Sequence, residues 1–78
     1  MDLKVYLADL RKLPPESRAE YIDKVEGSAF MVKLYPNCDF IAIFWDSSAN
    51  IDVPTHKDCV MKDVSGYDLT KFQPESIF

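Results

Sequence analysis

The chain has few of the residues from which catalytic and cofactor sites are usually built. Its 78 residues include two glycines, two cysteines and one histidine. Two isolated glycines, Gly27 and Gly66, exclude a glycine-rich loop that cradles a phosphate or a dinucleotide. Cys38 and Cys59 are too few and too far apart for a disulfide framework, and no Cys-x-x-Cys pair is present. These absences favour a protein that is not an enzyme and that holds no cofactor and no metal.

Long hydrophobic runs and basic clusters are missing too. No apolar stretch approaches the ~20 residues of a membrane span, and the sequence from Met1 to Lys4 lacks the apolar core of a signal peptide. Nine Lys and Arg stand against 13 Asp and Glu, which gives a net charge of −4. A nucleic-acid binder needs a clustered basic surface. We therefore predict a cytoplasmic protein with reduced thiols that binds neither membranes nor, directly, nucleic acid.

Apolar residues near the N-terminus recur at steps of three and four, which predicts a helix over residues 2–13. Asp2 can cap this helix, and Pro14 ends it because a residue that precedes proline avoids the α region. Pro15 suits the first turn of a second helix, which Gly27 would end. The expected buried stripe of the second helix contains Ala19, Ile22 and Val25, with Arg18 or Tyr21 at its edge.

The rest of the chain shows strand patterns separated by turn residues. Residues 30–35 alternate properly, and a turn at 36–39 joins them to an apolar strand at 40–45. Residues 51–53 form a short strand that Pro54 halts, because proline cannot donate to a ladder of hydrogen bonds.

Residues 59–64 alternate as a strand, although a helical turn capped by Thr55 fits this part of the chain as well. Residues 67–78 would form a short turn or helix and then a tail that packs back through its aromatic side chains. Helices followed by strands predict a single α+β domain spanning residues 1–78. Its two N-terminal helices would pack on one face of a three- to four-stranded antiparallel sheet.

The strand predicted at 40–45 is apolar on both of its faces. A strand with one wet face alternates apolar and polar residues, and this one does not. If two helices cover one face of the sheet, the other face is covered by the C-terminal segment, by a second copy of the chain or by a different protein. Monomers seldom leave such a large apolar patch exposed. The last two alternatives predict a partner-binding surface formed by Tyr35, Ile41, Ile43 and Trp45.

Three acidic residues, Glu16, Glu20 and Asp23, fall on one side of the second predicted helix. They form either an ordinary solvated face or an acidic docking surface for a basic partner. The negative net charge of the chain is compatible with the second interpretation, because opposite charges steer association. We therefore include these three residues among the candidate partner-binding residues.

These features favour a small, acidic, non-enzymatic protein-binding module that inhibits or regulates a larger macromolecule. Its partner would be another protein or a second copy of itself. In size and charge, such a compact acidic chain without catalytic motifs is similar to phage-encoded inhibitors of host defence, of which anti-CRISPR proteins are one example. The resemblance implies a role in binding a host component rather than in catalysis.

Two alternatives stay open. A thiol- or metal-dependent protein would use Cys59 with His56 and Cys38, because a cysteine nucleophile needs a histidine base and zinc needs three or four ligands. The other alternative is a structural subunit or homodimer that has no activity of its own.

Overall fold

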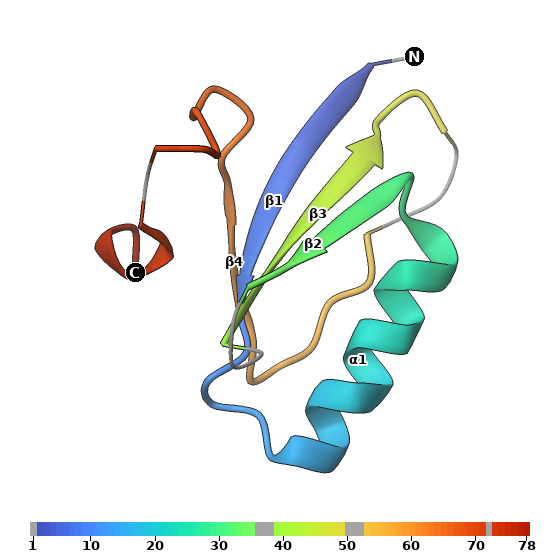
Figure 1. The fold of residues 1–78 in the computed structure, drawn as a ribbon. Helices are drawn as coiled ribbons and strands as arrows, with labels where there is room; N and C mark the ends of the chain where they lie inside the picture. The colour runs from blue at the N-terminus through green and yellow to red at the C-terminus, as the bar shows by residue number, and fades with distance from the viewer. Residues whose placement is uncertain (1, 36–38, 50–52, 72) are drawn as a thin grey trace.

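The computed structural model contains one helix and a four-stranded antiparallel sheet. The residues that it describes are 2–35, 39–49, 53–71 and 73–78. In Figure 1, α1 lies on one side of the sheet and the C-terminal segment on the other. The elements are β1 (Leu3–Asp9), α1 (Pro15–Ser28), β2 (Met31–Leu34), β3 (Phe40–Asp46), β4 (Val60–Asp63) and the short 3₁₀ helix η2 (Pro74–Ser76).

The strands lie in the order β2-β3-β1-β4, and each neighbouring pair is antiparallel. Strands β1 and β2 both pair with β3, so they run parallel to each other, and α1 is the crossover that such an arrangement requires. In the pairing of β1 with β3, Leu7 lies opposite Ala42 and Ala8 lies opposite Ile41. The two longest strands thus form the centre of the sheet, and the two short strands form its edges.

The α+β prediction with an antiparallel sheet is confirmed, but the prediction of two N-terminal helices is wrong. Residues 3–9, expected to be helical, form β1 instead. As a central strand, β1 is apolar on both faces, with Leu7 and Ala8 fully buried. Such a strand loses the alternation that identifies strands, and its apolar residues then also match a helical spacing.

The second predicted helix is present as α1, with a proline in its first turn. It does not end at Gly27: the helix continues to Ser28, and the amide of Ala29 donates to the carbonyl of Val25 at 2.8 Å. Its fully buried residues are Tyr21 and Val25, whereas Ala19 is exposed. The buried stripe is therefore rotated toward Tyr21, because the crossover lays this side of the helix on the sheet.

The predicted strands at 30–35, 40–45 and 59–64 correspond to β2, β3 and β4 within one residue at each end. The helical turn capped by Thr55, the alternative for the last of these, is not formed. The prediction for 51–53 falls mostly outside the described residues, and Val53 has no regular structure.

The sheet carries an apolar core on each face. We call the one beneath α1 the helix-side core and the one beneath the C-terminal segment the tail-side core. The helix-side core consists of Ala8, Leu10, Leu13, Tyr21, Val25, Ile41, Ile43 and Trp45. The tail-side core consists of Val5, Leu7, Phe40, Ala42 and Val64, with Leu69, Ile77 and Phe78 packed against it.

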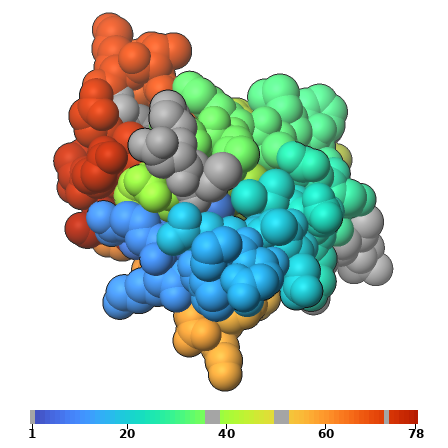
Figure 2. All heavy atoms as spheres, turned by 60° about the horizontal axis from the view of Figure 1, so that its bottom comes forward, coloured from blue at the N-terminus to red at the C-terminus, as the bar shows by residue number. Residues whose placement is uncertain are grey.

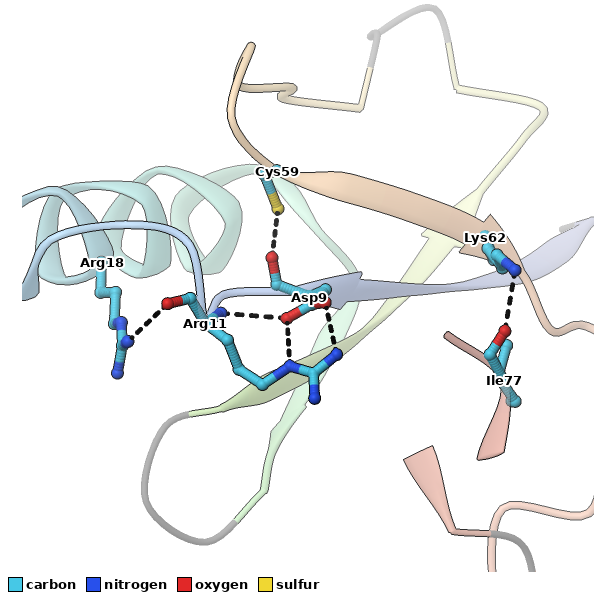
Figure 3. Close-up of polar contacts among 6 residues, drawn as sticks. All are labelled: Asp9, Arg11, Arg18, Cys59, Lys62 and Ile77. Atoms are coloured by element: carbon cyan, nitrogen blue, oxygen red, sulfur yellow. Dashed lines mark hydrogen bonds and ion pairs between the residues drawn. The ribbon is translucent and has the colours of Figure 1, made fainter. Parts of the chain in front are cut away.

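An ion pair between the buried Asp9 and the partly exposed Arg11 lies at the end of β1. The carboxylate of Asp9 accepts hydrogen bonds from Arg11 Nε at 3.0 Å and Arg11 Nη2 at 2.9 Å, and Cys59 Sγ donates to the Asp9 carbonyl at 3.2 Å (Figure 3). The guanidinium of Arg18 in turn binds the Leu13 carbonyl at 2.9 Å. These bonds tie the loop between β1 and α1 to the end of β1 and to the first turn of the helix.

We expect this ion pair to make folding sensitive to acid. The hydrogen bond from Arg11 lowers the pKa of Asp9 below its ordinary value of 3.8, against the opposing effect of burial. Because the pKa of Asp9 is lower in the folded chain than in the unfolded chain, the ion pair stabilises the fold at pH values above the ordinary pKa. This stabilisation is lost as the pH falls through the lowered pKa of the folded chain. In urea titrations at pH 7 and pH 3, Asp9→Asn should lower stability at pH 7 and reduce the loss between the two pH values.

Asp46, Asp63 and Asp68 also have lowered pKa values, because hydroxyls of Ser48, Ser65 and Thr70 donate to them. Some acid sensitivity should therefore remain in the Asp9→Asn variant. If that variant and the parent lost the same stability between pH 7 and pH 3, the ion pair would not be the source of the effect.

Candidate functional site

Three of the residues predicted to bind a partner lie inside the molecule. Ile41 and Ile43 are 0% exposed, and Trp45 is 5% exposed. All three belong to the helix-side core, where they share a cluster with Tyr21 and Val25 of α1. In this conformation they therefore offer no surface to a partner. Their apolar character is explained by the helix that covers them.

Tyr35, the fourth predicted residue of that surface, lies on the opposite face of the sheet. It packs against the tail-side core and is half-buried. Burial raises the pKa of its phenol. The ammonium of Lys33 lies 5.2 Å from the centre of the Tyr35 ring, a distance that suits a cation–π contact. The structure thus does not bring Tyr35 together with the other three.

The C-terminal segment covers much of the second sheet face. The Phe78 ring stacks on Phe40 with 5.7 Å between ring centres. The ammonium of Lys62 lies 5.3 Å from the centre of the Phe78 ring and donates to the Ile77 carbonyl at 2.8 Å (Figure 3). The guanidinium of Arg11 also contacts Phe40 and lies 4.9 Å from that ring's centre. Of the three coverings considered for this face, the chain's own segment is the one present.

Some apolar side chains do reach the surface, and three of the six large ones that are exposed among the described residues lie on or next to the edge strand β2. Phe30 is 60% exposed, Met31 is 51% exposed and Leu34 is 42% exposed. Within the described residues β2 pairs with β3 alone, so its other side has no neighbouring strand. Edge strands of this kind can pair with another chain unless they are protected. Lys33, in the middle of β2, is such a protecting charge.

The three predicted acidic residues lie together on the outer side of α1. Glu16, Glu20 and Asp23 are all exposed, and Glu26, which the sequence analysis did not select, extends this acidic face toward the end of the helix. The ion pairs found among the described residues involve Asp9 and Asp68, and none involves α1. Within the described part of the chain, the carboxylates of α1 therefore have no ion-pair partner.

Beside this acidic face, α1 and the loop after Pro54 enclose a small open groove of about 280 Å³. In Figure 2 the helix crosses the front of the molecule, and this loop, drawn in orange, lies along its lower border. The hydroxyl of Tyr21 donates to the Pro54 carbonyl at 2.8 Å and thereby joins the two walls. The groove is lined by Ser17, Glu20, Tyr21, Lys24, Thr55 and His56.

The sequence analysis missed this groove because its two walls are about 35 residues apart in the chain. Glu20 and His56 were each selected, but for different reasons, and no periodic pattern relates them. The backbone amide of Asp58 donates to Nδ1 of His56 at 3.1 Å, which orients the imidazole at the rim. Only the packing of the loop against α1 brings the two residues to one site.

The arrangement around Cys59 does not resemble an activated nucleophile. Its thiol donates to the Asp9 carbonyl, and burial raises its pKa to about 11. A nucleophilic cysteine needs a lowered pKa instead. Cys38, the third residue of the predicted thiol or metal site, lies outside the described residues. Among those that are described, no three His, Cys, Asp or Glu residues are grouped closely enough to hold a metal ion.

Three exposed features of the described residues could contact another molecule. They comprise an acidic helix face, an apolar sheet edge and a polar groove between α1 and a loop.

Across the described part of the chain, no helix has the length and apolar character needed to cross a bilayer. Comparisons with family models, with curated proteins and with solved structures found no match to this chain.

Proposed function

We propose that this chain is a small acidic protein-binding module, without enzymatic activity, that inhibits or regulates a larger macromolecule through the outer face of α1. The observation that carries the proposal is the set of exposed carboxylates at Glu16, Glu20, Asp23 and Glu26, none of which has an ion-pair partner within the described residues. A basic protein surface would supply the missing charges.

A helix that is already folded suits this role. α1 is anchored by Tyr21 and Val25 in the helix-side core, so binding would not have to order it. Uncompensated carboxylates on one face steer a basic partner and raise its association rate, and salt weakens this effect. Phe30 and Met31 follow α1 directly and are exposed, so they can add apolar contact area at one end of the acidic face.

Of the two alternatives, the thiol-dependent protein is weakened by the raised pKa of Cys59. The structural subunit or homodimer has one observation in its favour, the unpaired side of β2 with exposed Met31 and Leu34. A second copy could add its own β2 there and continue the sheet. Light scattering coupled to size exclusion, applied to the parent and to Leu34→Lys, would detect such a dimer and its loss.

The electrostatic proposal predicts a salt-dependent effect of charge reversal. Against a basic partner isolated with the parent protein, Asp23→Lys should weaken binding about two- to fivefold at low salt, since each exposed ion pair contributes up to about 1 kcal/mol. The difference should shrink at an ionic strength of about 0.3 M because exposed charges are then screened. Calorimetric titration at both salt concentrations measures it.

The matched control is Glu75→Lys, which makes the same charge change at an exposed position of η2, away from α1. It should leave the affinity nearly unchanged. Equal losses for Asp23→Lys and Glu75→Lys would show that only the net charge matters and would remove α1 as the binding surface.

A further inference from the structure

The groove between α1 and the loop after Pro54 is at the lower limit of the size of known small-molecule sites and is large enough for one side chain. Its volume of about 280 Å³ lies just below the ~300–1,000 Å³ range of small-molecule sites. It borders the acidic face of α1, since Glu20 belongs to both. A partner that docks on α1 would therefore place one of its side chains at or near this groove.

The groove is polar, and four of its six lining side chains make no hydrogen bond or ion pair with the other described residues. Tyr21 uses its hydroxyl to hold Pro54, and His56 uses Nδ1 to hold Asp58. No hydrogen bond or ion pair among the described residues engages the side chains of Ser17, Glu20, Lys24 or Thr55. Glu20 and Lys24 are spaced to pair along the helix, yet no ion pair joins them.

We infer that this groove receives an arginine side chain of the basic partner, with the Glu20 carboxylate as its main acceptor. This inference rests on the proposed function. A guanidinium offers five N–H donors in a planar fork, and the carboxylate of Glu20 with the hydroxyls of Ser17 and Thr55 supplies acceptors on both walls. Glu16 and Asp23 on the same helix face add a negative field that favours a cation.

Lys24 is the group that repels a cation in this groove. The inference can therefore be tested by whether removal of each charge raises or lowers the affinity. If a guanidinium enters, removing the carboxylate of Glu20 weakens binding, whereas removing the ammonium of Lys24 strengthens it. If an anion enters, both signs reverse, because Lys24 and the hydroxyls would then be the attractive groups. Two residues one turn apart on α1 therefore give opposite expected results for the two ligand charges.

The test uses the full chain labelled with ¹⁵N and N-acetyl-arginine amide as the probe. The control ligand is N-acetyl-citrulline amide, which has nearly the same shape but a neutral urea in place of the guanidinium. We expect the arginine compound to bind with a Kd on the order of 1–10 mM, as suits so small a ligand. It should shift the backbone amides of Glu20, Tyr21, Thr55 and His56, and the citrulline compound should shift them much less.

Three substitutions test whether Glu20 is the group that binds the guanidinium. Glu20→Gln should raise the Kd of the arginine compound by about threefold or more, and Lys24→Gln should lower it. Glu26→Gln, an equal charge change on α1 outside the groove, should have a smaller effect than Glu20→Gln. Equal shifts from both ligands, or equal effects of the Glu20 and Glu26 variants, would overturn the inference.

The arginine-binding experiment can fail independently of the experiment that tests the proposed function. If Asp23→Lys weakens the basic partner but the arginine compound does not shift the groove residues, the helix face binds and the groove inference fails. If the arginine compound binds in the groove but Asp23→Lys leaves the partner's affinity unchanged, the proposed use of the helix face fails instead.

Discussion

Replacing Ile43 with aspartate is expected to unfold the protein. Ile43 is 0% exposed and lies on β3 beneath α1, in the helix-side core. An unpaired carboxylate at this position must either lose its hydration or take up a proton, at a cost of several kcal/mol, in addition to the loss of the apolar side chain. A domain of 78 residues has a total stability of about 4–12 kcal/mol. Circular dichroism and a ¹⁵N–¹H spectrum at 25 °C would measure the result.

Met31→Asp is the matched control. It places the same carboxylate on the neighbouring strand β2, where Met31 is half exposed. The charge can remain in water there, so the variant should fold and lose no more than about 1 kcal/mol. If Ile43→Asp stayed folded while losing a partner or a dimer contact, Ile43 would belong to an interface after all, and its place in the core would be wrong.

Phe40→Ala is expected to be the second most damaging change and to act through the other face of the sheet. Phe40 is almost fully buried in the tail-side core, and truncation of a buried phenylalanine typically costs ~3–5 kcal/mol. Its ring also contacts both the Arg11 guanidinium and the Phe78 ring. The variant should therefore loosen the C-terminal segment as well as destabilise the whole fold.

Two measurements separate these effects. Urea denaturation gives the global loss, and amide hydrogen exchange at Ile77 and Phe78 reports the local loosening. Phe30→Ala serves as the control, because Phe30 is largely exposed. Its truncation should lower the free energy of unfolding by no more than about 1 kcal/mol. If Phe40→Ala left exchange at Ile77 and Phe78 unchanged relative to the rest of the chain, the stacked rings would not be what holds the segment in place.

Both predictions concern β3, the strand whose surplus of apolar residues first indicated an interface. Each of its faces is covered within a single molecule, by α1 and by the C-terminal segment. The proposed binding function therefore no longer depends on this strand. It depends on the carboxylates of α1, which the sequence placed on one helix side and the structure leaves exposed without ion-pair partners within the described residues.

Several features could be predicted from local sequence. Residues 15–28 form a helix because Pro15 starts it and an amphipathic pattern sustains it, and residues 40–46 form a strand because β-branched and aromatic residues dominate them. The acidic side of the helix followed from its periodicity alone. Such features depend on neighbours in the chain, which the sequence displays directly.

Only the tertiary structure decided the rest. Residues 3–9 became a strand because β3 and β4 pair with them on both sides, a contact between segments more than 30 residues apart. The same holds for the tail-side core closed by Phe78 and for the groove that joins Glu20 to His56. The local pattern of β1 suits a helix and a doubly buried strand alike, and the partners available in three dimensions select the strand.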